Sequence, residues 1–167
     1  DVVAGFFDHT VQMAAEGKRL RSFVAMLRYP GLALVVSPAA SKKVDSLTGL
    51  AGLNIGVSSP GSSTHMLLNH LLIKNGLAAT DVSAIGIGMA ASAVAAMESG
   101  RVDAAVMAEP AISQLRARKG DLRVLAHTQS LSGVRDVYGV TSYPAAVLYS
   151  NAEWVEKHQI LAVRLAK

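Results

Sequence analysis

The sequence of 167 residues contains no cysteine, which excludes disulfide bonds, thiolate metal sites and cysteine nucleophiles. Aromatic residues make up only 5% of the chain although hydrophobic residues make up 51%, so the core must be aliphatic. Charged residues are also scarce at 17%, yet no apolar run reaches the roughly 18 to 20 residues that a bilayer crossing requires. We therefore expect a globular chain with an aliphatic core.

Basic residues outnumber acidic ones, and the formal net charge is +4. The basic clusters lie at residues 18–21 and 116–123, and neither interleaves with the aromatic residues on which unpaired bases stack. We interpret both clusters as solvated faces and expect no nucleic-acid partner.

Short apolar runs alternate with helical patterns along most of the chain. The expected strands are residues 2–5, 22–27, 32–37, 53–57, 82–88, 103–107, 122–127 and 143–149. The expected helices are residues 8–16, 62–75, 90–99, 109–119 and a final helical stretch from residue 151. Such alternation predicts an α/β fold with mainly parallel sheets flanked by helices.

The order of these segments predicts two lobes. We assign residues 1–37 to part of lobe 1, residues 41–140 to a βαβαβα lobe 2, and residues 141–167 to a return to lobe 1 and the start of C-terminal helices. The first lobe is then incomplete. Because the sequence begins in a strand-like segment, we expect the natural N-terminus and any export signal to lie upstream.

The segment from Ile55 to His65 is the most informative part of the chain. An apolar strand runs into a glycine- and hydroxyl-rich turn, which opens directly into an amphipathic helix. Such a junction leaves the first N–H groups of the helix unpaired at the positive end of its dipole, where a small anion or polar oxygen binds. The residues expected to hold it are Ser59, Gly61, Ser62, Ser63 and Thr64. Plain helix capping by one of these serines is the structural alternative.

Two further strand ends are expected at the same edge, since ligands of open parallel sheets bind outside the carboxyl ends of the strands. One carries Met89 and the other Glu109, which either contacts the ligand or stabilises its own helix N-terminus. Gly86 and Gly88, with Glu109 about 20 residues further on, also mimic a dinucleotide-binding fingerprint. A nicotinamide-dinucleotide-binding enzyme domain is therefore an alternative function.

The histidines show no spacing typical of a metal site. His65 and His70 are five residues apart, whereas a zinc-binding helix separates its histidines by four. His65 is interpreted either as a ligand contact or as a solvent-facing residue. No serine lies in a nucleophile elbow, and no pair of carboxylates suggests acid–base work. We expect no metal, no cofactor and no catalysis.

The other lobe offers candidates of its own. Asp8 and His9 follow the first expected strand and open the first expected helix, which Asp8 is well placed to cap. If the lobes face each other, both residues contact the ligand from the opposite side. Tyr143, near the crossing back between lobes, is expected to wall the cleft, with a core aromatic as the alternative.

Several segments carry a family likeness: DVVAGFFDHT at residues 1–10, the strand at 34–36, the block 50–63, the run 92–104 and the pair Glu109-Pro110. Together they resemble solute-binding proteins of the nitrate/sulfonate/taurine type, which include thiamine-precursor-like members. The block around Gly61-Ser62-Ser63 is the most specific part. The resemblance implies a periplasmic-binding-protein-like fold of type II, whose two lobes close on a small solute.

The same resemblance implies a function. It points to an extracytoplasmic receptor that delivers a small anionic or zwitterionic solute, sulfonate-, nitrate-, taurine- or pyrimidine-like, to the inner-membrane permease of an ABC importer. An effector-sensing domain of a regulator is a further alternative, because related two-lobed folds serve there. Relative to the family, this chain lacks the first βα units and the C-terminal helices, so it resembles a partial chain. An incomplete lobe exposes apolar sheet surface, which favours a homo-oligomer.

Overall fold

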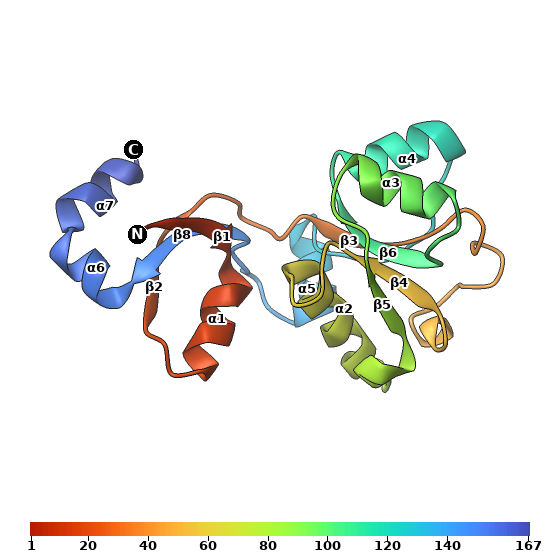
Figure 1. Ribbon diagram of the computed structural model, residues 1–167, viewed down its shortest axis with the longest axis horizontal. Coiled ribbons are helices and arrows are strands. Elements are labelled where there is room, and N and C mark those ends of the chain that lie inside the picture. The colour runs from red at the N-terminus through yellow and green to blue at the C-terminus, as the bar shows by residue number, and fades with distance from the viewer. The chain divides into compact units, whose positions relative to one another are not determined.

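The computed structural model describes residues 1–167, which form two compact units. The first unit combines Asp1–Pro30 with Gly139–Lys167, and the second comprises Gly31–Tyr138. Figure 1 shows the elements of each unit. None of the helices has the length and apolar character that a membrane crossing requires.

The first unit is built around a small antiparallel sheet with the strand order β1-β8-β2. Strand β8, from the end of the chain, therefore lies between two strands from its beginning. The elements of this unit are β1 (Val3–Phe6), α1 (Phe7–Ala15), β2 (Leu20–Ala25), β8 (Ala146–Asn151), α6 (Ala152–Lys157) and α7 (Gln159–Leu165).

The second unit holds a five-stranded mixed sheet with the order β5-β4-β6-β3-β7. Strand β4 runs parallel to β5 and β6, while β3 runs antiparallel to β6 and β7. Its elements are β3 (Leu32–Val36), η1 (Thr48–Leu50), β4 (Asn54–Val57), α2 (Ser63–Lys74), η2 (Ala79–Asp81), β5 (Ser83–Gly86), α3 (Ala91–Glu98), β6 (Ala104–Ala108), α4 (Ala111–Lys119), β7 (Val124–His127) and α5 (Leu131–Tyr138).

Helices cover both faces of this sheet, with α3 and α4 on one side and α2 and α5 on the other (Figure 1). Ala33 and Val35 of β3 belong to the aliphatic cluster beneath α3 and α4. Because side chains alternate along a strand, Leu32, Leu34 and Val36 face the opposite side. All five residues of β3 are buried, which explains their unbroken apolar run.

Helix α2 follows the expected pattern closely. Its buried leucines, spaced three and four residues apart, form the face that packs on the sheet; they are Leu67, Leu68, Leu71 and Leu72. Ser62 is the N-cap, and its side chain accepts a hydrogen bond from the N–H of His65. After the helix, Gly76 has φ +78°, a left-handed conformation that glycine adopts without strain.

The fold class is confirmed as α/β with sheets flanked by helices, but the strand at 32–37 lies in a different lobe from the one expected. β3 belongs to the second unit, whose first residue is Gly31. The reason is its pairing, because β3 bonds β6 on one side and β7 on the other and is central to the larger sheet. The same pairing makes that sheet mixed, and the smaller sheet is wholly antiparallel.

Three local expectations also differ from the structure. Helix α1 starts at Phe7 with Phe6 as its N-cap, so Asp8 lies within the first turn and is not the capping residue. Tyr143 and Pro144 precede β8, which starts only at Ala146 and is a central strand of its sheet. Helix α5 occupies a stretch for which the sequence predicted no element.

Candidate functional site

The carboxyl ends of β5, β4 and β6 lie side by side at one edge of the larger sheet, since these three strands are parallel neighbours. The pairing continues past the strands, because Ile87 N–H donates to Val57 O at 2.9 Å and Gly88 N–H to Ser58 O at 3.1 Å. The turn after β4 therefore lies directly against the loop after β5. This edge is where open α/β sheets bind ligands.

The turn between β4 and α2 is held by the hydroxyl of Thr64. Its Oγ1 accepts the Ser58 N–H at 2.8 Å and lies 3.0 Å from Ser58 Oγ and 2.8 Å from Ser62 Oγ. Thr64 is only 4% exposed, while its partners Ser58 and Ser62 are half-buried, so these bonds are partly shielded from water. Thr64 thus ties the end of the strand to the start of the helix.

The remaining amides of the turn also have partners inside it. Ser59 N–H approaches Ser62 Oγ at 3.5 Å, Ser62 N–H donates to Ser59 O at 3.1 Å, and Gly61 N–H donates to His65 Nδ1 at 2.9 Å. The expectation of unpaired amides is therefore wrong for the His65 N–H of the helix and for these turn residues. The backbone is fixed by its own side chains, and capping by Ser62 is observed.

Exposure separates the candidate residues of this turn into two groups. Ser59 and Gly61 are exposed and Ser62 is half-buried, so a solute can reach them. Ser63 and Thr64 are buried, at 5% and 4% exposed. The accessible hydroxyls are therefore those of Ser59 and Ser62, while Thr64 positions them from beneath.

The loop after β5 has an unusual backbone. Gly88 has φ +69°, and Ala90, the N-cap of α3, has φ 54° and ψ −126°, a region that side chains disfavour. The Ser92 hydroxyl donates to Met89 O at 2.8 Å and so steadies the loop. Met89 is 49% exposed. Gly86 faces the neighbouring turn, because a Cβ added there would lie 3.6 Å from Pro60 Cδ.

Glu109, after β6, serves its own helix. Its Oε2 accepts the Ser113 N–H of α4 at 3.0 Å. The side chain is exposed, and its charge lies at the positive end of the helix dipole. In the dinucleotide alternative with Gly86 and Gly88, this carboxylate would also have to bind a ribose hydroxyl.

The candidates of the first unit form a small cluster of their own. The rings of Phe7 and Tyr143 meet edge to face, with centroids 6.2 Å apart. Asp8, His9 and Tyr143 are half-buried. Burial raises the pKa of Tyr143, and the negative charge of Asp8 raises it further. The structure thus brings Asp8 and Tyr143 together, as sequence reasoning did not foresee.

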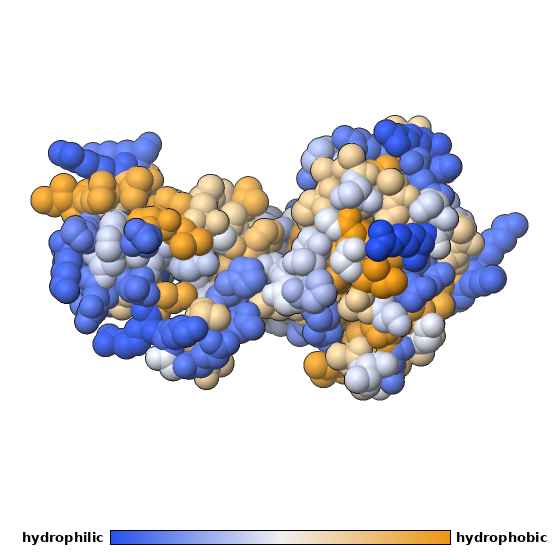
Figure 2. Space-filling model, viewed as in Figure 1, coloured by the Kyte–Doolittle hydropathy of each residue, from blue (hydrophilic) through white to orange (hydrophobic).

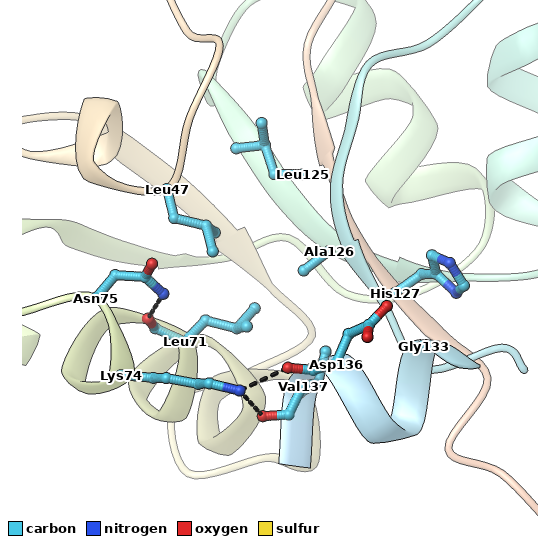
Figure 3. A pocket seen from close by; sticks show the side chains of 10 residues that line it. All are labelled: Leu47, Leu71, Lys74, Asn75, Leu125, Ala126, His127, Gly133, Asp136 and Val137. Atoms are coloured by element: carbon cyan, nitrogen blue, oxygen red, sulfur yellow. Dashed lines mark hydrogen bonds between the residues drawn. The ribbon is translucent and has the colours of Figure 1, made fainter. Parts of the chain in front are cut away.

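The second unit also contains an apolar cavity of about 290 Å³ that the sequence analysis missed. Its walls include Leu47, Leu71, Leu125 and Val137 (Figure 3). Lys74 Nζ lies at its rim and donates to Asp136 O at 2.5 Å and to Val137 O at 2.9 Å. These residues come from segments that are distant in sequence, so no local pattern signals the cavity.

A comparison with known proteins places this geometry in context. The model of the NMT1-like family matches residues 12–167. A solved structure from Bordetella bronchiseptica RB50 is 37% identical with a TM-score of 0.91, covering 99% of this chain and 52% of that chain. No curated protein matches the chain.

Two more distant structures share the fold. The periplasmic aliphatic sulphonate binding protein SsuA from Escherichia coli is 22% identical with a TM-score of 0.70, covering 99% of this chain and 52% of that chain. The periplasmic nitrate-binding protein NrtA from Synechocystis PCC 6803 is 16% identical with a TM-score of 0.64, covering 99% and 46%. The chain thus spans about half the length of these structures, and its fold is periplasmic-binding-protein-like.

Proposed function

The chain belongs to the NMT1-like family, and from this premise we propose that it is part of an extracytoplasmic receptor for an ABC importer. The solute is small and anionic or zwitterionic, of the sulfonate, nitrate, taurine or pyrimidine kind. The observation that carries the proposal is the hydroxyl-rich turn between β4 and α2, at the sheet edge where such folds bind ligands. The sulphonate- and nitrate-binding names of structures with the same fold support the solute class.

In this proposal the turn supplies the polar contacts. Ser59 and Ser62 offer accessible hydroxyls, Gly61 offers close approach to the backbone, and the first turn of α2 adds the favourable field of its dipole. Buried Thr64 holds the turn in shape through its bonds to Ser58 and Ser62. A hydrogen bond to a charged oxygen contributes about 1.5 to 3 kcal/mol, so a few of them suffice for selective binding.

The other candidate residues have secondary roles in the proposal. Met89 shapes the site from the β5–α3 loop, and Glu109 contributes through the placement of α4. We propose that Asp8 and His9 of the first unit contact the solute and that Tyr143 shapes the pocket. The permease of the inner membrane is the proposed protein partner, and no cofactor takes part.

A thermal-shift panel tests the proposal directly. Methanesulfonate, taurine, nitrate, bicarbonate, amino acids and pyrimidines are compared, and saturable stabilisation by one class is expected. The double variant S59A/S62A should lose that stabilisation, while T80A, a change at an exposed residue of η2, should keep it. No stabilisation by any solute, with protein that includes both lobes in full, would contradict the receptor function.

We also propose that the first unit associates with a second copy of this chain. Its buried apolar residues are few and small: Ala145, Val147, Ala152, Val155 and Ala162. By contrast, Ile160 is 75% exposed and Val163 58%, and Figure 2 shows hydrophobic side chains over the region of α7. Exposed apolar patches of this kind mark association surfaces.

Light scattering after size exclusion tests this association. A concentration-dependent dimer is expected, and the variant I160K/V163K should shift it toward monomer. A wild-type chain that stays monomeric at every concentration contradicts the proposal.

A further inference from the structure

His65 is the one titratable side chain among those that hold the backbone of the β4–α2 turn. The other side-chain acceptors in the turn are the hydroxyl oxygens of Thr64 and Ser62. His65 Nδ1 lies 2.9 Å from the Gly61 nitrogen and accepts its N–H. Pro60, the residue before Gly61, has no N–H to donate. The Gly61 N–H is therefore the backbone donor that links the tip of the turn to helix α2.

This bond fixes the protonation state of the ring. An N–H donor must meet a nitrogen that carries a lone pair, so Nδ1 is unprotonated and the ring proton is assigned to Nε2. Protonation would turn Nδ1 into a second donor and leave the Gly61 N–H without its acceptor. The imidazole is only half-buried, so protons from solvent can reach it.

His65 takes part in none of the ion pairs of the structure, which join Lys18 with Glu16, Arg21 with Glu156, Arg118 with Glu98, and Lys157 with Glu153. Around His65 the polar partners are the Gly61 amide and the Ser62 hydroxyl, which accepts the His65 N–H at 3.4 Å. An imidazolium here would also lie in the first turn of α2, where the helix dipole disfavours positive charge.

We propose that His65 is a positioning residue, whose neutral imidazole holds the solute-binding turn in its binding shape through Gly61. This inference rests on the function proposed above for the turn. Gly61 has φ +80°, a conformation that glycine adopts without strain, and its own N–H is held by this bond to His65. Protonation of His65 breaks this bond and loosens the turn at Gly61, so affinity for an anionic solute falls although positive charge is added.

Two substitutions separate the acceptor from the ring. In H65N the side-chain oxygen stands the same number of bonds from the backbone as Nδ1, so the acceptor is kept and the titration is removed. In H65F the ring remains and the acceptor is lost. If the acceptor matters, H65N behaves as wild type at neutral pH and H65F does not. The reverse pattern would show that the ring acts by packing, which overturns the proposal.

The first readout needs no solute. In nitrogen-15 NMR spectra of the wild type, the signals of the Gly61 amide and of the His65 ring should shift together as the sample is acidified. The Gly61 amide should not titrate in H65N, and it should exchange with solvent roughly threefold to tenfold faster in H65F than in wild type, as the loss of one hydrogen bond implies. The proposal is overturned if the chemical shift of the Gly61 amide does not change when the His65 ring is protonated.

The second readout is binding of methanesulfonate, which stays charged over this range. Its affinity for wild type should fall roughly threefold to tenfold on acidification and stay constant for H65N. A rise in wild-type affinity would mean that the imidazolium contacts the solute directly, which also overturns the proposal. If methanesulfonate fails to bind at all, the proposed function fails for that solute, while the Gly61 amide still decides the role of His65.

Discussion

Thr64 Oγ1 accepts the backbone N–H of Ser58 at 2.8 Å, and this bond joins the end of β4 to the first turn of α2. The same oxygen lies within hydrogen-bonding distance of the hydroxyls of Ser58 and Ser62. Removing this oxygen leaves the amide of the half-buried Ser58 without its protein partner. The shape of the candidate site therefore depends on a side chain that is itself barely accessible.

Replacing Thr64 by valine tests this dependence. The two side chains have similar shape, so T64V removes the acceptor with little change in packing. We expect a loss of about 0.5 to 1.5 kcal/mol in the free energy of unfolding, the net contribution of one hydrogen bond, measured by urea denaturation. T64S keeps the hydroxyl and should lose less. Equal stability of T64V and wild type would show that the bond contributes nothing.

Gly56 of β4 is required by close packing on the sheet face beneath α3 and α4. A Cβ added there would overlap Ile87 Cδ1 and lie 2.9 Å from Ala105 Cβ. We expect G56A to destabilise the chain by about 1 to 3 kcal/mol through overpacking. Adding I87V, which removes the overlapping methyl, should recover part of the loss. G49A, where the added Cβ meets only Ser46 Oγ at 3.4 Å, is the matched control.

We predict that the Glu109 carboxylate stabilises the start of helix α4 rather than binding the solute. E109A removes the acceptor for the Ser113 N–H, so we expect a loss of about 0.5 to 2 kcal/mol in unfolding free energy. E109Q keeps an acceptor oxygen and should recover most of it. Solute titration of E109Q then separates the roles, because a contact to a solute amine needs the charge and capping does not. Tighter or unchanged binding by E109Q excludes an amine contact.

Tyr143 makes the free energy of unfolding depend on pH in the alkaline range. Burial and then the Asp8 charge raise its pKa above the ordinary 10.0, so the folded chain holds this proton more tightly than the unfolded chain. The contribution of protonated Tyr143 to the free energy of unfolding is complete below about pH 10, and it is lost as pH rises through the folded-state pKa. Tyrosinate absorbance, with Y143F subtracted, should show the raised value, and D8N should lower it only in part. A Tyr143 titration at or below 10 contradicts this account.

The sequence predicted the elements whose pattern is local. The leucines of α2 and the glycine after it defined that helix to within a residue or two, because a 3.6-residue period and a left-handed cap are properties of the segment itself. The partners of β3 were not predictable in this way. A strand buried on both faces reads as an unbroken apolar run whatever its neighbours are, so nothing in Leu32–Val36 signals antiparallel pairing in the second unit.

In the candidate site, too, features with a local sequence pattern were predictable and those that depend on the folded turn were not. The hydroxyls of the turn stood out in the sequence, which left open which serine caps the helix, and the structure identifies it as Ser62. The bonds from Ser58 to Thr64 and from Gly61 to His65 depend on how the turn folds back on the helix, which spacing alone does not specify. Phe6 at the N-cap of α1, in place of Asp8, is a further example, since no side-chain bond caps that helix end.

One measurement tests the central claim, that the β4–α2 turn binds the oxygens of a small anionic solute. Methanesulfonate is titrated into nitrogen-15-labelled protein at neutral pH while the backbone amides are followed by NMR. The account predicts saturable shifts concentrated at Ser59, Gly61, Ser62 and the first turn of α2, abolished in S59A/S62A. Saturable shifts confined to other segments, such as the walls of the apolar cavity around Leu71 and Val137, would contradict it.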